Sequence, residues 1–384
     1  MFILGEGCMR RNSLILLFAT ILLFPACANA YYQVIDLGTL GGDRSIALSI
    51  NNSGQIVGWA ENTSGWRYAT LFDPTGGGNN INLGTLGGRI STACSINNSG
   101  QIVGWAQNSL LAWRGTLFDP SGRRNNIDLV TLGGVGSSAL SINDSGQIVG
   151  WAQNGSGIGH ATLFNRSPGG NNTDLSTIGG GESDAICIND SGQIVGAAQN
   201  GSGNYRATLF DITGSGNNID LGTLGGVESA ASSINNDGQI VGSATRKEGT
   251  SHATVFDPSG GGNNIDLGTL DGRESWAYSI NESKQIVGWA DNSSGYLHAT
   301  LFDPTGAGNN IDLNTLIDPA SGWILSQACS INDSGWIVGS GSNPNGELHA
   351  YLLIPEPVTL LLLGLGVLCL KKRKKTDCRF PIAE

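Results

Sequence analysis

The sequence predicts an all-β protein whose body is a closed ring of seven four-stranded blades, a seven-bladed β-propeller. Three observations carry this prediction: a fixed repeat period, four strand-like segments in each repeat, and a body that holds a whole number of repeats. The string Gln-Ile-Val-Gly recurs every 46 residues and a variant copy follows after 51, so that the copies begin at Gln55, Gln101, Gln147, Gln193, Gln239, Gln285 and Trp336. A fixed period of this size is typical of propellers and solenoids.

Each repeat contains four segments with the character of short β-strands. The first, represented by residues 263–270, alternates polar and apolar side chains as a half-buried strand does. The second, represented by residues 139–143, is followed by Asp144-Ser145-Gly146, whose residue types tolerate the backbone of a tight turn. The third and fourth are represented by residues 147–152 and 160–164.

The number of repeats favours a closed ring. The first strand-like segment of the body is residues 32–37, the last is residues 349–353, and residues 31–354 hold close to seven periods. A whole number of blades suits closure, which protects the edge strands. An open β-solenoid is the alternative, although the terminal repeats carry no obvious polar cap. The repeats alone leave open how the ring closes and where each blade begins.

Composition and charge exclude several classes of protein. The chain has 59 glycines without a Gly-X-Y order, which excludes collagen, and 39% hydrophobic residues, which is too many for a disordered chain. Residues 31–355 hold 12 Lys and Arg against 27 Asp and Glu, a net charge of −15. A body this acidic repels phosphate backbones, so nucleic acid is not an expected partner.

The first 30 residues have the pattern of a secretory signal peptide. The positively charged residues Arg10 and Arg11 precede an apolar run over residues 14–24, and an Ala-x-Ala cleavage motif follows at residues 28–30. Either Met1 or Met9 serves as the start, since both place a charged region before the apolar run. The cleavage site predicted by this pattern consists of Ala28, Ala30 and Tyr31.

The C-terminal region combines a short motif, an apolar segment and a basic cluster over residues 355–375, followed by a tail at 376–384. The apolar segment, residues 358–370, would span about 20 Å as a helix, which is short of the roughly 30 Å hydrocarbon core. The basic cluster after it favours a cytoplasmic end for this short transmembrane helix. The motif and cluster are Pro355, Glu356, Pro357, Lys371, Lys372, Arg373, Lys374 and Lys375.

This three-part ending resembles the PEP-CTERM sorting signal of Gram-negative bacteria. The resemblance implies recognition by an exosortase, removal of the tail near the Pro-Glu-Pro motif, and export to the cell surface or an extracellular polysaccharide matrix. A plain tail anchor is the alternative. The stretch after the basic cluster is longer than such signals usually carry, which leaves the trimming site open.

The body resembles the HAF repeat, a bacterial extracellular repeat named for His-Ala-Phe. The triplet occurs at His160, His252, His298 and His349, each followed by Ala, while Tyr68, Arg114 and Arg206 take the His position in the other three repeats. The companion strings Leu-Gly-Thr-Leu-Gly-Gly and Ile-Asn-x-x-Gly-Gln-Ile-Val-Gly match as well. The resemblance supports the repeat architecture and implies no particular chemistry.

The titratable residues give no catalytic or metal-ligating set. The four histidines occupy one repeat position on separate blades, too far apart to share a metal ion, so a structural role at a strand or neighbouring loop is expected. The cysteines of the body, Cys94, Cys187 and Cys329, fall in non-adjacent repeats and are expected to be free buried thiols. No cofactor is expected.

Repeated carboxylates and aromatic residues are also expected to be structural. Asp and Asn cap turns through side-chain hydrogen bonds, and Ca²⁺ bound to these oxygens is the alternative. The aspartates concerned are Asp73, Asp119, Asp257 and Asp303 in the linkers, and Asp128, Asp220, Asp266 and Asp312 before leucine. Trp59, Trp105, Trp151 and Trp289 share the position after Ile-Val-Gly and are expected between blades, whereas Ala197, Ser243 and Ser340 replace them elsewhere.

These observations favour a secreted, non-enzymatic propeller that acts as a cell-surface or extracellular-matrix module, with an extracellular polysaccharide or a surface protein as partner. The alternative is a propeller enzyme acting on extracellular glycan, which would gather non-repeat side chains at one channel mouth. A solvated rim is the interpretation we favour for the side chains concerned, which are Glu182, Asp184, Glu228, Arg273 and Glu274.

Overall fold

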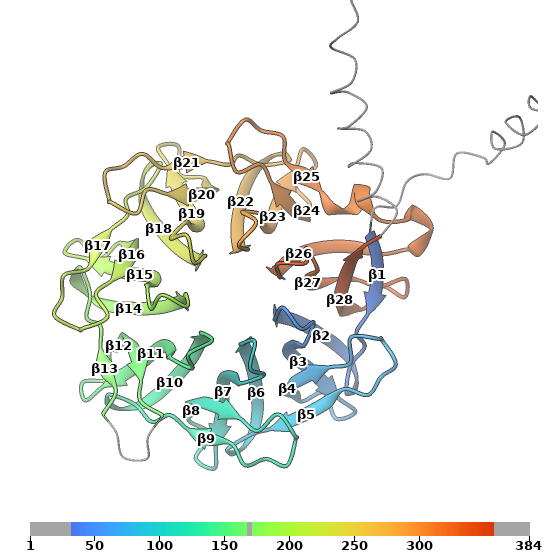
Figure 1. Ribbon diagram of the computed structural model, residues 1–384, viewed down its shortest axis with the longest axis horizontal. Coiled ribbons are helices and arrows are strands. Elements are labelled where there is room, and N and C mark those ends of the chain that lie inside the picture. Colours follow the sequence, from blue (N-terminus) through green and yellow to red (C-terminus); the bar gives the residue numbers. More distant parts are fainter. Residues whose placement is uncertain (1–31, 167–170, 357–384) are drawn as a thin grey trace, which may run out of the picture.

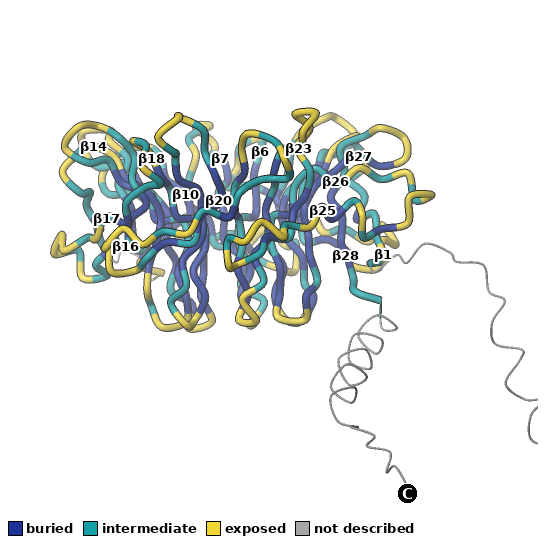
Figure 2. The backbone as a smooth tube through the Cα atoms, turned by 90° about the horizontal axis from the view of Figure 1, so that it is seen from above, coloured by how far each residue is buried: buried dark blue, intermediate teal, exposed yellow. Residues whose placement is uncertain are grey.

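The computed structural model describes residues 32–166 and 171–356. These residues form seven four-stranded antiparallel sheets arranged as blades around a central channel (Figure 1), which confirms the predicted seven-bladed β-propeller. Seen from the side, the ring is a flat disc whose buried strands lie between exposed loops (Figure 2). The expected signal peptide, the Pro357 end of the sorting motif, the apolar segment and the basic cluster lie outside the described residues. Among the described residues, no helix is long and apolar enough to cross a membrane.

The inner strand of each blade lies next to the channel (Figure 1) and is longer than the sequence suggests. In blades 1 to 5 it includes the Gly-Gly segment before the apolar pattern, and in blade 6 Asp271 replaces the first glycine. Every inner strand has a β-bulge or register shift where it pairs with the second strand, for example between Ala47 and Ser49 in blade 1 and between Ala328 and Ser330 in blade 7. The inner strands of blades 1 to 7 are β2 (Gly41–Ile50), β6 (Gly87–Ile96), β10 (Gly133–Ile142), β14 (Gly179–Ile188), β18 (Gly225–Ile234), β22 (Asp271–Ile280) and β26 (Ile324–Ile331).

The second and third strands are the Gln-Ile-Val-Gly and His-Ala-Thr segments, and they occur where the sequence predicts them. The second strands are β3 (Ile56–Asn62), β7 (Ile102–Asn108), β11 (Ile148–Asn154), β15 (Ile194–Asn200), β19 (Ile240–Arg246), β23 (Ile286–Asn292) and β27 (Ile337–Ser342). The third strands are β4 (Arg67–Phe72), β8 (Trp113–Phe118), β12 (Gly159–Phe164), β16 (Tyr205–Phe210), β20 (Ser251–Phe256), β24 (Leu297–Phe302) and β28 (Leu348–Pro355).

The outer strands are much shorter than the eight-residue pattern predicts, and most have two residues. They are β5 (Ile81–Gly84), β9 (Ile127–Asp128), β13 (Thr173–Asp174), β17 (Ile219–Asp220), β21 (Ile265–Asp266) and β25 (Ile311–Asp312). The rest of the alternating segment leaves the sheet and connects to the next blade. In the last repeat this connection holds two short 3-10 helices, η1 (Leu313–Leu316) and η2 (Pro319–Ser321).

The ring closes because the first strand of the chain completes the last blade. Strand β1 (Tyr32–Asp36) pairs with β28, which gives the order β1-β28-β27-β26 in blade 7. Val34 lies opposite Leu353, and both belong to the apolar contacts of this blade. Each blade therefore starts one strand later than the sequence repeat does, and the two ends of the body hold each other.

Hydrophobic side chains fill the interfaces between neighbouring blades. Val57 and Ala69 of blade 1, for example, pack against Ile102, Ala106 and Phe118 of blade 2, and all five are buried. Equivalent clusters occur at the other interfaces, including the one between blades 7 and 1. Because each blade buries its faces against two neighbours, the ring is stabilised as a whole.

The glycine of the Gln-Ile-Val-Gly string is required by close strand packing. A Cβ atom at Gly58 would lie 2.0 Å from the main-chain oxygen of Ile46 on the inner strand. The same contact, 1.9–2.0 Å, recurs at the equivalent glycines of the other blades. Any side chain at this position would push the inner and second strands apart.

Candidate functional site

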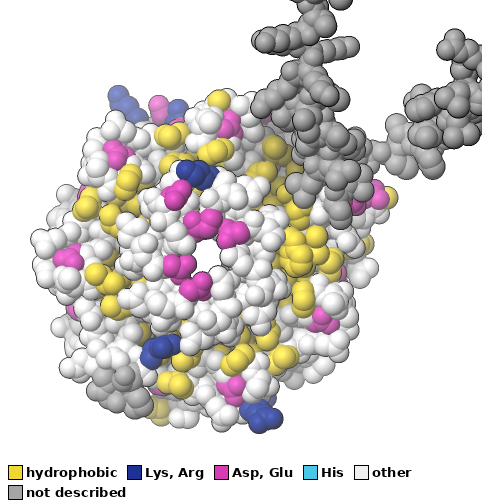
Figure 3. All heavy atoms as spheres, viewed as in Figure 1, with side chains coloured by type: hydrophobic (Ala, Val, Ile, Leu, Met, Phe, Trp, Pro, Cys, Tyr) yellow, Lys and Arg dark blue, Asp and Glu magenta, His cyan; other side chains and the backbone are white. Residues whose placement is uncertain are grey.

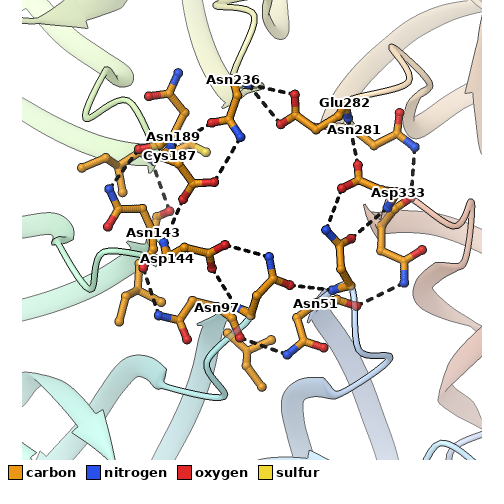
Figure 4. Close-up of a pocket in the computed structure, with 18 of the residues that line it drawn as sticks. Asn51, Asn97, Asn143, Asp144, Cys187, Asn189, Asn236, Asn281, Glu282 and Asp333 are labelled. Carbon is orange, nitrogen blue, oxygen red and sulfur yellow. Dashed lines mark hydrogen bonds between the residues drawn. The ribbon is translucent and has the colours of Figure 1, made fainter.

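Seven asparagines, one from each blade, form a closed ring around one mouth of the central channel. Figure 4 shows part of this ring, including Asn51, Asn97, Asn143, Asn189 and Asn281. Each follows an inner strand, and its side-chain amide donates a hydrogen bond to the main-chain carbonyl oxygen of the equivalent asparagine in the next blade, at 2.9–3.3 Å. The last of these bonds joins blade 7 back to blade 1. This amide ring consists of Asn51, Asn97, Asn143, Asn189, Asn235, Asn281 and Asn332.

A second, exposed ring lies beside the amide ring, at the next position of each repeat. The main-chain N–H of each residue donates to the side-chain oxygen of its counterpart in the next blade, at 2.8–3.1 Å. Four of its seven members are acidic, and they surround the channel opening (Figure 3). Burial, together with the charges of Asp333, Asp237 and Asp190, raises the pKa of Glu282. The members of this outer ring are Asn52, Asn98, Asp144, Asp190, Asn236, Glu282 and Asp333.

Both rings are occupied in holding the blades together. Their side chains accept or donate bonds between neighbouring repeats, so most of their hydrogen-bonding capacity is used by the fold. The mouth they enclose is a small cavity of about 220 Å³. The channel mouth is therefore first a structural feature, and it repeats around the ring.

The four histidines have the structural role expected from their repeat position. Nδ1 of His160 lies 2.8 Å from Oδ2 of Asp174 in the adjacent outer strand, and His252, His298 and His349 have equivalent aspartate partners. Arg114 and Arg206 take the same place and pair with Asp128 and Asp220. Only blade 1 departs, with Tyr68 facing an outer strand that carries asparagine at Asn82. The position therefore ties the third strand to the outer strand.

The linker aspartates cap turns, as the sequence predicts. Oδ1 of Asp73 accepts hydrogen bonds from the main-chain N–H and hydroxyl of Thr75, and Oδ2 accepts from the side chain of Asn79. These bonds lower the pKa of Asp73 to about 2. Asp119, Asp257 and Asp303 repeat the arrangement. In residues 32–166 and 171–356, no group of three or more His, Cys, Asp or Glu is placed to hold a metal ion.

Cys94, Cys187 and Cys329 are free thiols, as expected, but each is half-buried rather than fully buried. Burial raises the pKa of Cys94 and of Cys329 to about 12, and it also raises that of Cys187. A thiol held protonated in this way is a poor nucleophile. These residues contribute to packing.

The sevenfold pattern breaks in blades 4 and 5, where a pocket of about 370 Å³ opens. In blades 1, 2, 3 and 6 the second strand carries tryptophan directly after Ile-Val-Gly, but Ala197 and Ser243 take this position in blades 4 and 5. We call this cavity the blade 4–6 pocket. Its lining residues are Asp184, Ile186, Ala197, Tyr205, Glu228, Ser229, Ala230, Ser243, Thr245, Ser251 and Trp276.

In blades 1 and 2 the tryptophans fill the equivalent space. Trp105 stacks on Trp113 with ring centres 4.7 Å apart and planes 7° apart. The guanidinium of Arg67 lies over the rings of Trp59 and Trp105, 5.3 and 5.0 Å from their centres. Blades 4 and 5 lack both large rings at this position, so the space stays open.

Carboxylates and a tyrosine form one side of the blade 4–6 pocket. Asp184 lies on β14 directly opposite Ala197 on β15, and its carboxylate has no hydrogen-bond partner among the described residues. Burial, with a further contribution from the negative charge of Glu182, raises the pKa of Asp184 to about 6. The hydroxyl of Tyr205 donates to Oε2 of Glu182 at 2.5 Å. Burial and this acidic neighbour raise the pKa of Tyr205.

Trp276 of blade 6 forms the other side of the pocket. Its indole Nε1 donates to the hydroxyl of Ser232 at 2.8 Å, which fixes the ring. The residue lies opposite Trp289 in the sheet, and its ring centre is 6.3 Å from that of Tyr278. An aromatic ring held in this way offers a flat apolar surface to a ligand.

The five side chains singled out from the sequence do not gather at a channel mouth. Asp184 and Glu228 line the blade 4–6 pocket, and Glu182 adjoins it through Tyr205. Arg273 and Glu274 are exposed and do not line it; their main-chain N–H groups donate to Oδ1 of Asp291. Asp184 is half-buried, so the expectation of a solvated rim is wrong for this residue.

Sequence reasoning recorded Ala197 and Ser243 but did not connect them with Asp184, Tyr205 or Trp276. The signal was the loss of a large side chain from the same position in two consecutive repeats. A repeat protein that omits a space-filling residue in neighbouring units opens a cavity unless other residues fill it.

No family model and no curated protein matches the chain. Among solved structures, the fold is similar to Trypanosoma rangeli sialidase in complex with the inhibitor DANA, with 11% identity and a TM-score of 0.44 over 90% of this chain and 62% of that one. Trypanosoma rangeli sialidase is also similar, with 12% identity and a TM-score of 0.42 over 91% and 62%. The chain spans less than two thirds of the length of these proteins, and the likeness is one of fold.

Proposed function

We propose that this protein is exported to the cell surface or the extracellular matrix, where it acts as a non-enzymatic interaction module that binds polysaccharide. The blade 4–6 pocket is the observation that carries the proposal. Pockets of about 300–1,000 Å³ with apolar walls and a few polar groups are typical of small-ligand sites, and this one lies on a rigid scaffold. It is also a place where the repeat pattern departs from symmetry, as a specific site does.

The placement of the chain ends supports presentation of this pocket on a surface. Strands β1 and β28 pair in blade 7, so the described chain begins and ends on one blade. Blade 4, which supplies Asp184 and Tyr205 to the pocket, lies across the ring from blade 7 (Figure 1). A chain tethered beyond Glu356 would be held by blade 7, so this side of the pocket would lie on the far side of the ring from the tether.

Export and sorting rest on the two terminal segments. The proposed signal peptide would end at Ala30, and an exosortase would process the chain near Pro355 after transient anchoring in the inner membrane. The test is the intact mass of the protein from fractions of its own host. A species that starts at Tyr31, ends near Pro355 and occurs in the extracellular matrix supports sorting, whereas an uncleaved chain confined to the inner membrane contradicts it.

Polysaccharide binding is tested with the same mature protein. The host's own extracellular polysaccharide, immobilised on beads, should retain the protein in a saturable way and release it when soluble polysaccharide is added. The heat-denatured protein is the control for unspecific adsorption. Absence of saturable retention would contradict the interaction role.

A second function is favoured by one observation: two carboxyl groups, Asp184 and Glu228, line the same pocket, and the pKa of Asp184 is raised to about 6. A carboxyl group with a raised pKa can act as a general acid, and glycoside hydrolysis requires a pair of carboxyl groups. New reducing ends released from host polysaccharide by the wild type, but not by Asp184→Asn, would establish an enzyme.

A further inference from the structure

We propose that the blade 4–6 pocket binds a hexosamine unit whose amino group is free and positively charged. This inference rests on the proposed function and specifies where the module binds polysaccharide and which sugar it takes. It follows from the space in the pocket, the charge of its lining and the aromatic wall.

The cavity exists because blades 4 and 5 carry small residues at the second-strand position where other blades carry tryptophan. Ser243 pairs with Ala253 in the sheet as Trp59 pairs with Ala69 in blade 1, so the backbone at Ser243 has the pairing that holds a tryptophan. Ala197 stands at the same position in the preceding blade. The resulting cavity of about 370 Å³ lies within the size range of sites for small ligands.

The charge of the lining selects for a cation. The lining includes Asp184 and Glu228 and no Lys, Arg or His. Glu182 adds a third carboxylate beside Tyr205. No hydrogen bond or ion pair among the described residues engages the carboxylate of Asp184 or of Glu228. A bound ammonium would provide the missing partner, whereas an anionic sugar would meet uncompensated negative charge.

The aromatic wall selects for a sugar rather than a simple amine. Trp276 is fixed by its bond to Ser232 and presents apolar surface to the cavity. The C–H face of a pyranose ring can pack on such a surface while its hydroxyls reach polar groups on the rim. The hydroxyls of Ser243, Thr245 and Ser251 line the same cavity. A free amino group is required because acetylation removes the positive charge that the carboxylates would pair with.

The experiment measures the dissociation constant of a glucosamine disaccharide by calorimetry, on the mature protein at neutral pH and physiological salt. The N-acetylated disaccharide, a galacturonate disaccharide and putrescine are compared. Glucosamine disaccharide should bind at least tenfold more tightly than any of the three, a difference of about 1.4 kcal/mol. Equal binding of putrescine would overturn the sugar specificity, and equal binding of the N-acetylated form would overturn the role of the charge.

Three variants separate the pocket from unspecific attraction to an acidic protein. Ser243→Trp fills the cavity without changing the charge, and Asp184→Asn with Glu228→Gln removes the charge without filling it. Both should weaken binding of the glucosamine disaccharide at least tenfold. Glu274→Gln is the matched control, because it removes an exposed charge at the repeat position of Glu228 outside the pocket, and it should leave binding unchanged. Melting temperatures close to that of the wild type would show that each variant is folded.

The outcomes distinguish this inference from the proposed function. If the wild type and the Ser243→Trp variant both bind host polysaccharide equally, the pocket assignment is wrong while the interaction role stands. If the wild type binds neither host polysaccharide nor the disaccharide, both fail. If Glu274→Gln weakens binding as much as the pocket variants do, the attraction is a general effect of surface charge.

Discussion

Replacement of Asn97 by alanine should remove one link of the amide ring and destabilise the whole propeller. The side-chain amide of Asn97 donates to the main-chain oxygen of Asn143 and to Oε1 of Gln101, both at 2.9 Å, and its Oδ1 accepts from the N–H of Gln101 at 2.9 Å. Asn97 is only 4% exposed, so water does not replace these bonds.

The expected loss can be estimated from these three bonds. Each contributes about 0.5–1.5 kcal/mol net, and the partners left behind are buried, so the free energy of unfolding should fall by about 2–4 kcal/mol. An entropy of unfolding of about 2.1 cal/mol/K per residue over roughly 325 residues converts this to a fall of about 3–6 °C in melting temperature.

Asn98→Ala is the matched control for this prediction. Asn98 adjoins Asn97 in sequence and belongs to the outer ring, but it is exposed. Its amide donates to Oδ2 of Asp144 and its Oδ1 accepts from the main-chain N–H of Asn52, and both inter-blade bonds are in contact with solvent. Differential scanning calorimetry of both variants should show less than about 1 kcal/mol of loss for Asn98→Ala. If the two variants lose the same stability, or if Asn97→Ala loses none, the buried bonds of the amide ring are not what stabilises the propeller.

Three further predictions concern ring closure and the thiols. His349 lies against Asp36 on β1, and the hydrogen bond that its Nδ1 donates to the Asp36 carboxylate raises the pKa of His349. The stabilisation from this pair is full below about pH 6.5 and is lost as the pH rises through the folded-state pKa. His349→Gln should therefore cost more stability at pH 5.5 than at pH 9, and an equal cost at both would exclude the ion pair. A mature chain that starts at Leu37 lacks β1 and its half-buried apolar side chains Tyr32, Val34 and Ile35, so it should unfold at least about 5 °C lower. A synthetic peptide of residues 31–38 should restore part of this loss, and an unchanged melting temperature would contradict closure by β1. In the mature protein, a thiol reagent at pH 8 should label the half-buried thiols much more slowly than in denaturant, because their raised pKa values keep them protonated at this pH. Equally rapid labelling of the native protein would contradict this reasoning; the thiols are Cys94, Cys187 and Cys329.

The repeat architecture could be predicted because its signals are local. Gln-Ile-Val-Gly and His-Ala-Thr form strands wherever they occur, and the Asp-Ser-Gly type of turn joins the strands before and after it. The structural role of the histidines was predictable for the same reason: His160 and Asp174 are 14 residues apart in one repeat. Strand lengths were less predictable, since the outer strand keeps only the residues that pair with the third strand.

The candidate site could be predicted only in part. Asp184 and Glu228 were singled out because they depart from the repeat, but Trp276 and Tyr205 were not linked to them. These residues come from three blades, and each sequence repeat describes one blade at a time. Whether an unusual residue faces a neighbouring blade, the channel or solvent depends on how the blades are oriented around the ring.

By itself, the sequence determined the strands of each repeat and the number of blades, because each depends on residues near one another in the chain. Only the tertiary structure decided how the ring closes and which side chains meet across it. Asn332 bonds to Asn51 although 281 residues separate them, and Val34 pairs with Leu353. These contacts form only when seven blades of fixed shape complete a circle, and the same packing leaves the blade 4–6 pocket open where two large side chains are missing.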